Sequence, residues 1–220
     1  FPTAAGLASS ASGYAALVMA LDDFFDWHLD KKSLSILARL GSGSASRSVY
    51  KGFVLWHRGE REDGLDSFAE RLDIAWPELR LAVVTVSAES KTVGSTEGMK
   101  QTVATSTLYQ SWPQKAQHDL NELDKALQHK DFDRLGRTAE SNALAMHATM
   151  IDTQLPLLYW LPETVRTFAQ IWHLRKQGHA LYFTIDAGPN VKILFLQHQI
   201  EFVKTVFPDC EIIAPFVKTP

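Results

Sequence analysis

The sequence predicts an α+β fold, in which helices and strands do not alternate regularly along the chain. Three observations support this prediction. Apolar residues recur at helical spacing in several long segments, β-prone apolar runs stand between turn residues, and no segment repeats another. With 220 residues, of which 45% are hydrophobic, the chain is long enough for one large domain or two smaller lobes.

The first part of the chain predicts two helices and one strand. Apolar side chains recur at helical spacing from Tyr14 to Phe24, and a similar pattern predicts a second helix over residues 33–40. The run "GFVLWH" at 52–57 has the composition of a strand.

A boundary between two lobes is predicted after this strand. Residues 58–77 are charged, contain two glycines and end at Pro77. We therefore expect residues 1–60 to belong to an N-terminal ATP-binding lobe, 61–77 to form a linker, and 78–220 to form a C-terminal lobe.

The second lobe begins with a strongly β-prone strand, "ELRLAVVTVS" at 78–87, which a polar turn follows. Amphipathic spacing then predicts three helices, and three further apolar runs predict the strands that complete the sheet. The helices are expected at 112–127, 131–150 and 161–174, and the strands at 180–185, 192–197 and 210–214.

Composition limits the classes of partner that the chain is expected to bind. A net charge of −3 without a basic cluster argues against nucleic acid, and the longest apolar run, residues 14–21, is too short to cross a membrane. The single Cys210 excludes an internal disulfide framework and fits a reducing compartment. The eight histidines show no metal-ligand spacing, so no metal-binding residues are predicted, and His147 and His173 are expected to pack within helices.

The first loop whose residues could bind a ligand is "PTAAGLASS", directly before the first helix. Small residues let the backbone approach a ligand, and the helix N-terminus attracts anions. The expected ligand is therefore a phosphate chain. Ser9 and Ser10 can add hydroxyl donors. The alternative is a capped helix after a tight turn. The P-loop pattern GxxxxGK is absent.

The second loop, "GSGSASRS" at 41–48, places Arg47 among serines. A guanidinium presents a rigid fork that suits carboxylate or phosphate, and hydroxyls can complete the binding shell. The alternative is a serine-rich helix start with a solvated arginine.

Two further loops stand before a helix and after a strand. Ser95 and Thr96 lie at a predicted helix N-terminus, where an ordinary cap is the simpler interpretation. Asp186 follows the strand "FTI" and precedes Ala-Gly-Pro-Asn, where it is either a turn former or a catalytic acid.

Five motifs in this order resemble one family along almost the whole chain: "PTAAGLASSAS", "GSGSASRS", "GSTEGM", "SNALAMHATMIDT" and "FTIDAGPNV". They are similar to the diphosphomevalonate decarboxylases, within the superfamily of galactokinase, homoserine kinase, mevalonate kinase and phosphomevalonate kinase. The resemblance implies a two-lobed fold with mixed or antiparallel sheets flanked by helices. It also implies a cytoplasmic homodimer that acts in isoprenoid biosynthesis.

The activity implied is ATP-dependent decarboxylation of 5-diphosphomevalonate to isopentenyl diphosphate, with release of ADP, phosphate and CO₂. The 3-hydroxyl would be phosphorylated first, and phosphate and CO₂ would then leave. ATP and Mg²⁺ are implied, with the ion held mainly through phosphates.

The resemblance also assigns roles residue by residue. The ATP phosphates would lie against Gly6, Ala8, Ser9 and Ser10. The substrate would lie against Ser42, Gly43, Ser44, Ala45, Ser46 and Arg47, with Arg47 at its carboxylate. Ser95 and Thr96 would meet the phosphate-bearing end of the substrate or the transferring phosphoryl group, and Asp186 would lie at the tertiary hydroxyl.

Two departures from the family pattern matter. Relatives usually begin with a longer segment that includes a "KYWGK"-like motif, so we expect this chain to be a truncated copy that is inactive alone. Ser46 stands where many relatives have cysteine.

Two other functions compete. A sister kinase would phosphorylate a mevalonate-like alcohol and stop, but the presence of both Arg47 and Asp186 favours decarboxylation. A non-catalytic nucleotide-binding module would show degraded motifs, whereas Ser9, Ser10, Arg47 and Asp186 are all intact.

Overall fold

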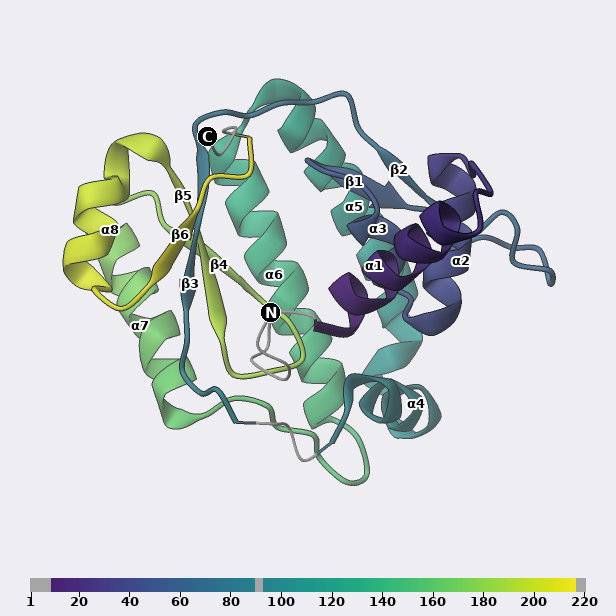
Figure 1. Cartoon of the computed structure of the whole chain (residues 1–220). Coiled ribbons are helices and arrows are strands. Elements are labelled where there is room, and N and C mark those ends of the chain that lie inside the picture. Colours follow the sequence, from purple (N-terminus) through teal and green to yellow (C-terminus); the bar gives the residue numbers. More distant parts are fainter. Residues whose placement is uncertain (1–8, 90–92, 217–220) are drawn as a thin grey trace. The chain divides into compact units, whose positions relative to one another are not determined.

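The computed structural model describes residues 9–89 and 93–216, with the side chain of Ser9 left out (Figure 1). The chain divides into two compact units, residues 1–75 and 76–220. The division falls inside the segment 61–77. Part of that segment is a strand of the first unit, Ala69–Arg71, which the sequence did not predict.

Within residues 9–75, the first unit contains three helices and a two-stranded antiparallel sheet. Its elements are α1 (Ser9–Phe24), α2 (Lys31–Gly41), α3 (Ala45–Ser48), β1 (Val54–Trp56) and β2 (Ala69–Arg71). The three helices share one buried cluster, formed by Ala15, Val18, Leu34, Ala38, Ala45 and Val49. Small side chains let the helices approach closely: a Cβ atom at Gly41 would lie 2.0 Å from the ring of Tyr14.

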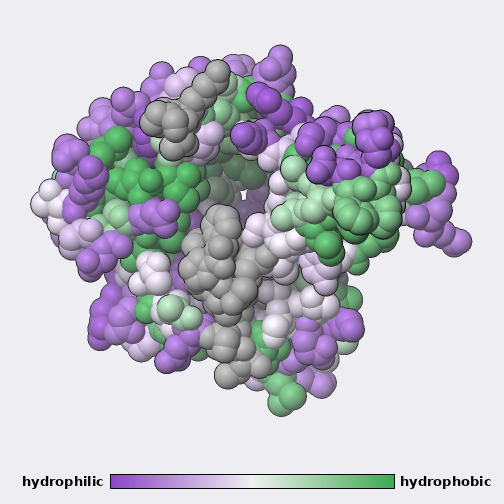
Figure 2. Space-filling view, viewed as in Figure 1, coloured by the Kyte–Doolittle hydropathy of each residue, from purple (hydrophilic) through white to green (hydrophobic). Residues whose placement is uncertain are grey.

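The buried hydroxyl of Ser35 links three elements of this unit. It donates to the carbonyl of Ser46 at 2.9 Å and accepts from the backbone N–H of Ala69 at 2.8 Å. One side chain on α2 therefore fixes both α3, which carries Arg47, and the start of β2. Apolar side chains are also exposed along α1 (Figure 2), among them Leu17, Met19 and Phe24.

The second unit is a four-stranded antiparallel sheet with helices packed against it. The strands are β3 (Leu79–Val84), β4 (Tyr182–Ile185), β5 (Val191–Leu196) and β6 (Glu211–Ile213), in the spatial order β4-β5-β3-β6. The helices are α4 (Ser95–Thr105), α5 (Trp112–His129), α6 (Phe132–Ile151), α7 (Pro162–Lys176) and α8 (Ile200–Val206). Short 3₁₀ turns occupy Leu108–Ser111 and Gln197–Gln199.

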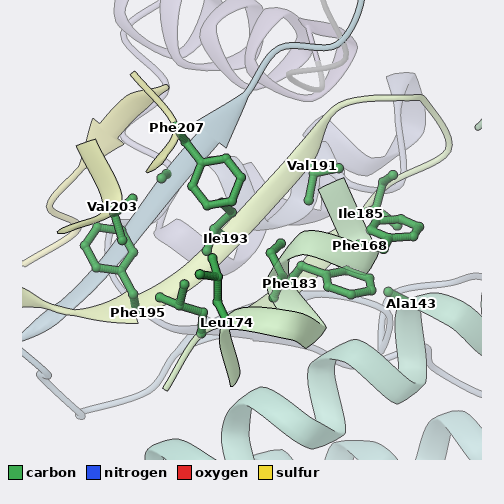
Figure 3. Close-up of a cluster of buried hydrophobic side chains, with 13 residues drawn as sticks. Ala143, Phe168, Leu174, Phe183, Ile185, Val191, Ile193, Phe195, Val203 and Phe207 are labelled. Carbon is green, nitrogen blue, oxygen red and sulfur yellow. The ribbon is translucent and has the colours of Figure 1, made fainter. Parts of the chain in front are cut away.

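One face of this sheet forms the main core (Figure 3). Phe183 of β4 stacks on Phe168 of α7 with ring centroids 4.1 Å apart, and Ile193 of β5 lies in the same fully buried cluster. Residues directly opposite in an antiparallel pair share a face. Since Phe183 pairs with Ile193, and Thr184 pairs with Lys192, Lys192 lies on the opposite face from this core.

A buried polar network joins α6, α7 and β4. The carboxylate of Glu140 accepts from Arg175 and, at 2.7 Å, from the indole N–H of Trp172. The Nε atom of Arg175 donates to the carbonyl of Leu181 at 2.8 Å. A buried carboxylate is tolerated when it is paired in this way, and the network fixes α7 against α6.

The predicted α+β class with antiparallel sheets is confirmed. The predicted helices and strands of the second unit are found close to their predicted bounds, and α8 is an addition. Within the described residues, the helices lack the combination of length and apolarity that a membrane span requires.

The role of Ser35 gives a stability prediction. We expect Ser35→Ala to lower the free energy of unfolding by about 1–3 kcal/mol, because the buried N–H of Ala69 loses its acceptor. Urea denaturation would measure the change. Ser48→Ala on the exposed end of α3 is the control, and a Ser35→Ala loss no larger than that of the control would refute the structural role.

Candidate active site

The first candidate element, within the first unit, is the serine–arginine loop, residues 42–48, together with the start of α1. The hydroxyls of Ser10 and Ser42 lie 3.4 Å apart, and those of Ser42 and Ser44 lie 3.3 Å apart. Three hydroxyls from two sequence-distant motifs therefore gather beside a helix N-terminus. This arrangement offers donors to an anion, because the first backbone N–H groups of a helix have no partner within the helix.

Other residues of the loop shape its backbone. Ser46 is fully buried, and its hydroxyl donates to the carbonyl of Gly43 at 2.8 Å. Ala45 is also fully buried in the cluster of the first unit. Their side chains therefore hold the loop, and a ligand in contact with these positions would meet backbone.

Arg47 is exposed, and its guanidinium lies over the ring of Trp56 at 5.6 Å from the centroid. The indole N–H of Trp56 donates to Ser67 at 3.3 Å, which orients the ring. A Cβ atom at Gly43 would lie 2.8 Å from the same indole, so the absence of a side chain there lets the loop approach β1. Trp56 thus supports the arginine through a cation–π contact, a role that the strand prediction did not reveal.

A second candidate element, within the second unit, is the Asp186 loop, residues 186–190, which joins β4 to β5. Asp186 follows the last residue of β4, and 67% of its side chain is exposed. Its Oδ2 atom accepts from the Nζ atom of Lys192 at 2.9 Å. The lysine is on β5, and only 12% of its side chain is exposed.

Buried hydrogen bonds fix the backbone of the Asp186 loop from three directions. Asn190 accepts from the N–H groups of Val86 and Ser87 at 2.7 and 3.0 Å, and donates to the carbonyl of Ser87 at 3.0 Å. Thr164 of α7 donates to the carbonyl of Pro189 at 2.8 Å. The loop is therefore preorganised, as a catalytic acid or base requires.

The third contact comes from His147 of α6, which lies within the motif "SNALAMHATMIDT". Its Nε2 atom lies 3.0 Å from the carbonyl oxygen of Asp186, so Nε2 carries the hydrogen and donates. His147 is fully buried beside the ring of Trp160, and its Nδ1 atom has no hydrogen-bond partner among the described residues. Burial lowers the pKa of His147 to about 4, so the side chain is neutral near pH 7.

The start of α4 is the third predicted element. Ser95 and Thr96 are exposed in its first turn, after the N-cap residue Gly94. The hydroxyl of Tyr159 donates to the carbonyl of Val93 at 3.2 Å, and a Cβ atom at Gly98 would lie 2.7 Å from the same hydroxyl. Tyr159 thus fixes the start of the helix.

Asp152 holds the other end of α4. It accepts from the N–H of Leu108 and from the hydroxyls of Ser106 and Thr107, at 2.9 to 3.0 Å. These hydrogen bonds, first that of Leu108, lower the pKa of Asp152. Tyr159 therefore holds the start of α4, and Asp152 holds its end.

The predicted site residues are thus distributed over both units. The first unit brings Ser10, Ser42 and Ser44 together, and the second joins the Asp186 loop to residues 86–87. Gly6 and Ala8 lie outside the described residues. Within residues 9–89 and 93–216, no group of three or more His, Cys, Asp or Glu side chains is placed to hold a metal ion.

Comparison with known proteins identifies the family. The profile of the diphosphomevalonate decarboxylase-like N-terminal domain matches residues 1–69, and that of the mevalonate 5-diphosphate decarboxylase C-terminal domain matches residues 81–219. The chain therefore belongs to the diphosphomevalonate decarboxylase family, which confirms the resemblance found from the five motifs.

The diphosphomevalonate decarboxylase of Aspergillus fumigatus is 43% identical over 209 residues, which are 92% of this chain and 52% of that protein. The chain spans about half the length of the curated relatives it matches. The solved mevalonate diphosphate decarboxylase of Enterococcus faecalis is 40% identical with a TM-score of 0.88, over 96% of this chain and 66% of that one. A structure of MDDEF in complex with MVAPP, AMPPCP and magnesium is 41% identical with a TM-score of 0.89, over 96% and 67% of the two chains.

The buried histidine gives a pH-dependent prediction. The pKa of His147 falls from its ordinary value of 6.5 to about 4 in the folded chain. Between these values the unfolded chain binds more protons, so stability is complete above pH 6.5 and falls by up to about 3 kcal/mol as the pH drops toward 4. We expect His147→Gln to remove this part of the pH dependence, as measured by urea denaturation at several pH values.

The comparison with wild type isolates the histidine, because Asp133 and Asp152, whose pKa values are lowered, contribute in both proteins. His129→Gln on the exposed end of α5 is the control and should keep the wild-type slope. Identical slopes in His147→Gln and wild type would contradict the assignment.

Proposed function

We propose that the chain acts in the ATP-dependent decarboxylation of 5-diphosphomevalonate to isopentenyl diphosphate, with ADP, phosphate and CO₂ as the other products. The observation that carries this proposal is the presence, in a member of this family, of both an exposed Arg47 and an exposed Asp186 on hydrogen-bonded loops. An acid that activates a hydroxyl would suffice for a kinase. The arginine adds a partner for a carboxylate.

The first step is phosphoryl transfer to the tertiary hydroxyl. Hydroxide is a poor leaving group, so the alcohol must become a phosphate ester before it departs. Asp186 orients the hydroxyl and accepts its proton while the oxygen attacks the γ-phosphorus of ATP. The carboxylate needs correct position more than strong basicity, because the attacking oxygen loses its proton as the bond to phosphorus forms.

The second step is the linked loss of phosphate and CO₂. Departure of the phosphate builds positive charge at the tertiary carbon, and the breaking C–C bond of the carboxylate supplies the electron pair for the new alkene. Arg47 holds the carboxylate in alignment with the breaking C–O bond through its planar fork. The Trp56 ring keeps the guanidinium over β1 during this step.

The start of α1 is the proposed phosphate site, with Ser9 and Ser10 at the helix end and Gly6 and Ala8 before it. The Ser10, Ser42 and Ser44 hydroxyls suit a phosphate chain and the Mg²⁺ that such a chain holds through its own oxygens. When bound, the ion supplies charge neutralisation. We assign Ser95 and Thr96 to the phosphate-bearing end of the substrate or the transferring phosphoryl group.

In this proposal residues 1–60 contribute the nucleotide and carboxylate contacts, and residues 78–220 contribute the acid. We also propose that the protein is a cytoplasmic homodimer. Support for the compartment comes from the single Cys210, whose thiol pKa is raised by burial, as in a packed and unreactive cysteine. Light scattering after size-exclusion chromatography would test the dimer.

The acid gives the first functional prediction. In the full gene product that contains these residues, Asp186→Asn should lower kcat by about 100- to 10,000-fold, because the amide cannot accept the proton. Binding of 5-diphosphomevalonate should weaken only modestly. ADP, CO₂ and isopentenyl diphosphate would be measured together, with Asp209→Asn, another exposed aspartate of the second unit, as the control. Full ATP turnover by Asp186→Asn would overturn the role, and ADP without CO₂ from wild type would indicate a kinase.

The proposed role of Arg47 gives a second functional prediction. Arg47→Lys should lower kcat/KM by about 10- to 100-fold, because an ammonium cannot reproduce the two parallel hydrogen bonds of the fork. Arg58→Lys, an exposed arginine of the same unit, should leave the rate unchanged. Equal rates in the Arg47→Lys variant and wild type would show that the guanidinium does not hold the carboxylate.

A further inference from the structure

Lys192 is unusual for a lysine in a sheet. It interrupts the apolar strand "VKILFL", its neighbours Val191 and Ile193 are fully buried, and its own side chain is only 12% exposed. Lysine is seldom buried to this extent unless it is paired with an opposite charge. The ammonium of Lys192 has such a partner in Asp186, at 2.9 Å.

The two side chains of this ion pair differ in exposure and in how firmly their elements are paired. Lys192 belongs to β5, whose pairing with β3 and β4 fixes it between Val83 and Thr184 on the face opposite the main core. Asp186 lies beyond the end of β4, and 67% of its side chain is exposed. The rigid, buried member is thus the lysine, so the lysine orients the carboxylate.

The backbone of Asp186 is held by a separate group. His147 donates to its carbonyl at 3.0 Å, and the N–H of Gly188 donates to the same carbonyl at 2.7 Å. These contacts fix the residue but leave the torsions of its side chain to be set by something else. The ammonium of Lys192 sets them, because it engages one carboxylate oxygen, Oδ2.

We propose that Lys192 is a positioning residue, whose ammonium holds Oδ2 of Asp186 toward β5 and so presents Oδ1 to the reacting hydroxyl. This inference rests on the proposed function. During transfer the proton moves from the substrate hydroxyl to Oδ1, the new O–P bond forms, and the bond from the γ-phosphorus to ADP breaks. The ammonium takes no part in the proton transfer.

The test compares two substitutions in the full gene product. Lys192→Met keeps most of the side-chain length without the charge, whereas Lys192→Arg keeps the charge. We expect Lys192→Met to lower kcat by about 10- to 100-fold, as small misplacements of catalytic groups do, with KM changed less than about 3-fold. Lys192→Arg should recover most of the lost rate.

The split between kcat and KM, read beside thermal unfolding, separates positioning from mere stability. A misdirected carboxylate should lower kcat and leave KM nearly unchanged at a temperature at which both the variant and wild type are folded. A purely structural lysine would alter thermal unfolding and leave kcat of the folded enzyme in place.

A double substitution tests whether Lys192 acts through Asp186. In the Asp186→Asn background, Lys192→Met should have little further effect on kcat, because the carboxylate it serves is gone. Multiplied effects would overturn the proposal, since they would show that the lysine acts on its own. Lys204→Met, an exposed lysine of α8, is the control for loss of a surface charge.

The outcomes are distinct. If wild type forms isopentenyl diphosphate and Lys192→Met matches it in kcat, this inference alone is overturned. If wild type forms no isopentenyl diphosphate, the proposed function is overturned, and this inference with it. Should Lys192→Met fail to fold, Lys192→Gln replaces it with the same expected loss of kcat.

Discussion

The buried amide of Asn190 is the contact that ties the Asp186 loop to the end of β3. Its three hydrogen bonds tie the end of the Asp186 loop to residues 86–87, which follow β3. These two segments are about a hundred residues apart in the chain, so the amide joins what the backbone alone does not. A side chain with only a donor or only an acceptor could not make all three bonds.

The long elements were predictable from sequence because their signals are local. Helices such as α5 and α6 repeat an apolar face over several turns, and β3 is a dense β-prone run. The short elements were not. β2 has three residues, two of them charged, and depends on its pairing with β1 and on the Ser35 hydroxyl. Such strands are set by tertiary contacts rather than by composition.

The candidate site shows the same contrast between residues with a local sequence signal and residues placed by tertiary contacts. Motif order predicts Arg47 and Asp186 as site residues, because the motifs that carry them can be read directly from the sequence. The supporting residues lie in other elements: Trp56 on β1, His147 on α6 and Lys192 on β5. A charge inside the apolar run "VKILFL" was the one local signal available for Lys192. Ala45 and Ser46 illustrate the reverse case, since the turn of α3 directs their side chains into the first unit.

The register of the β4–β5 hairpin decides which side chain lies beside the Asp186 carboxylate. Side chains alternate between the two faces of a sheet, so the pairing of Lys192 with Thr184 keeps the lysine on the face opposite the aromatic core. A slip of this pairing by one residue would turn the lysine toward that core and bring a hydrophobic side chain to the carboxylate. The hydrogen bonds that hold the hairpin therefore select the chemistry beside Asp186 as much as the identity of residue 192 does.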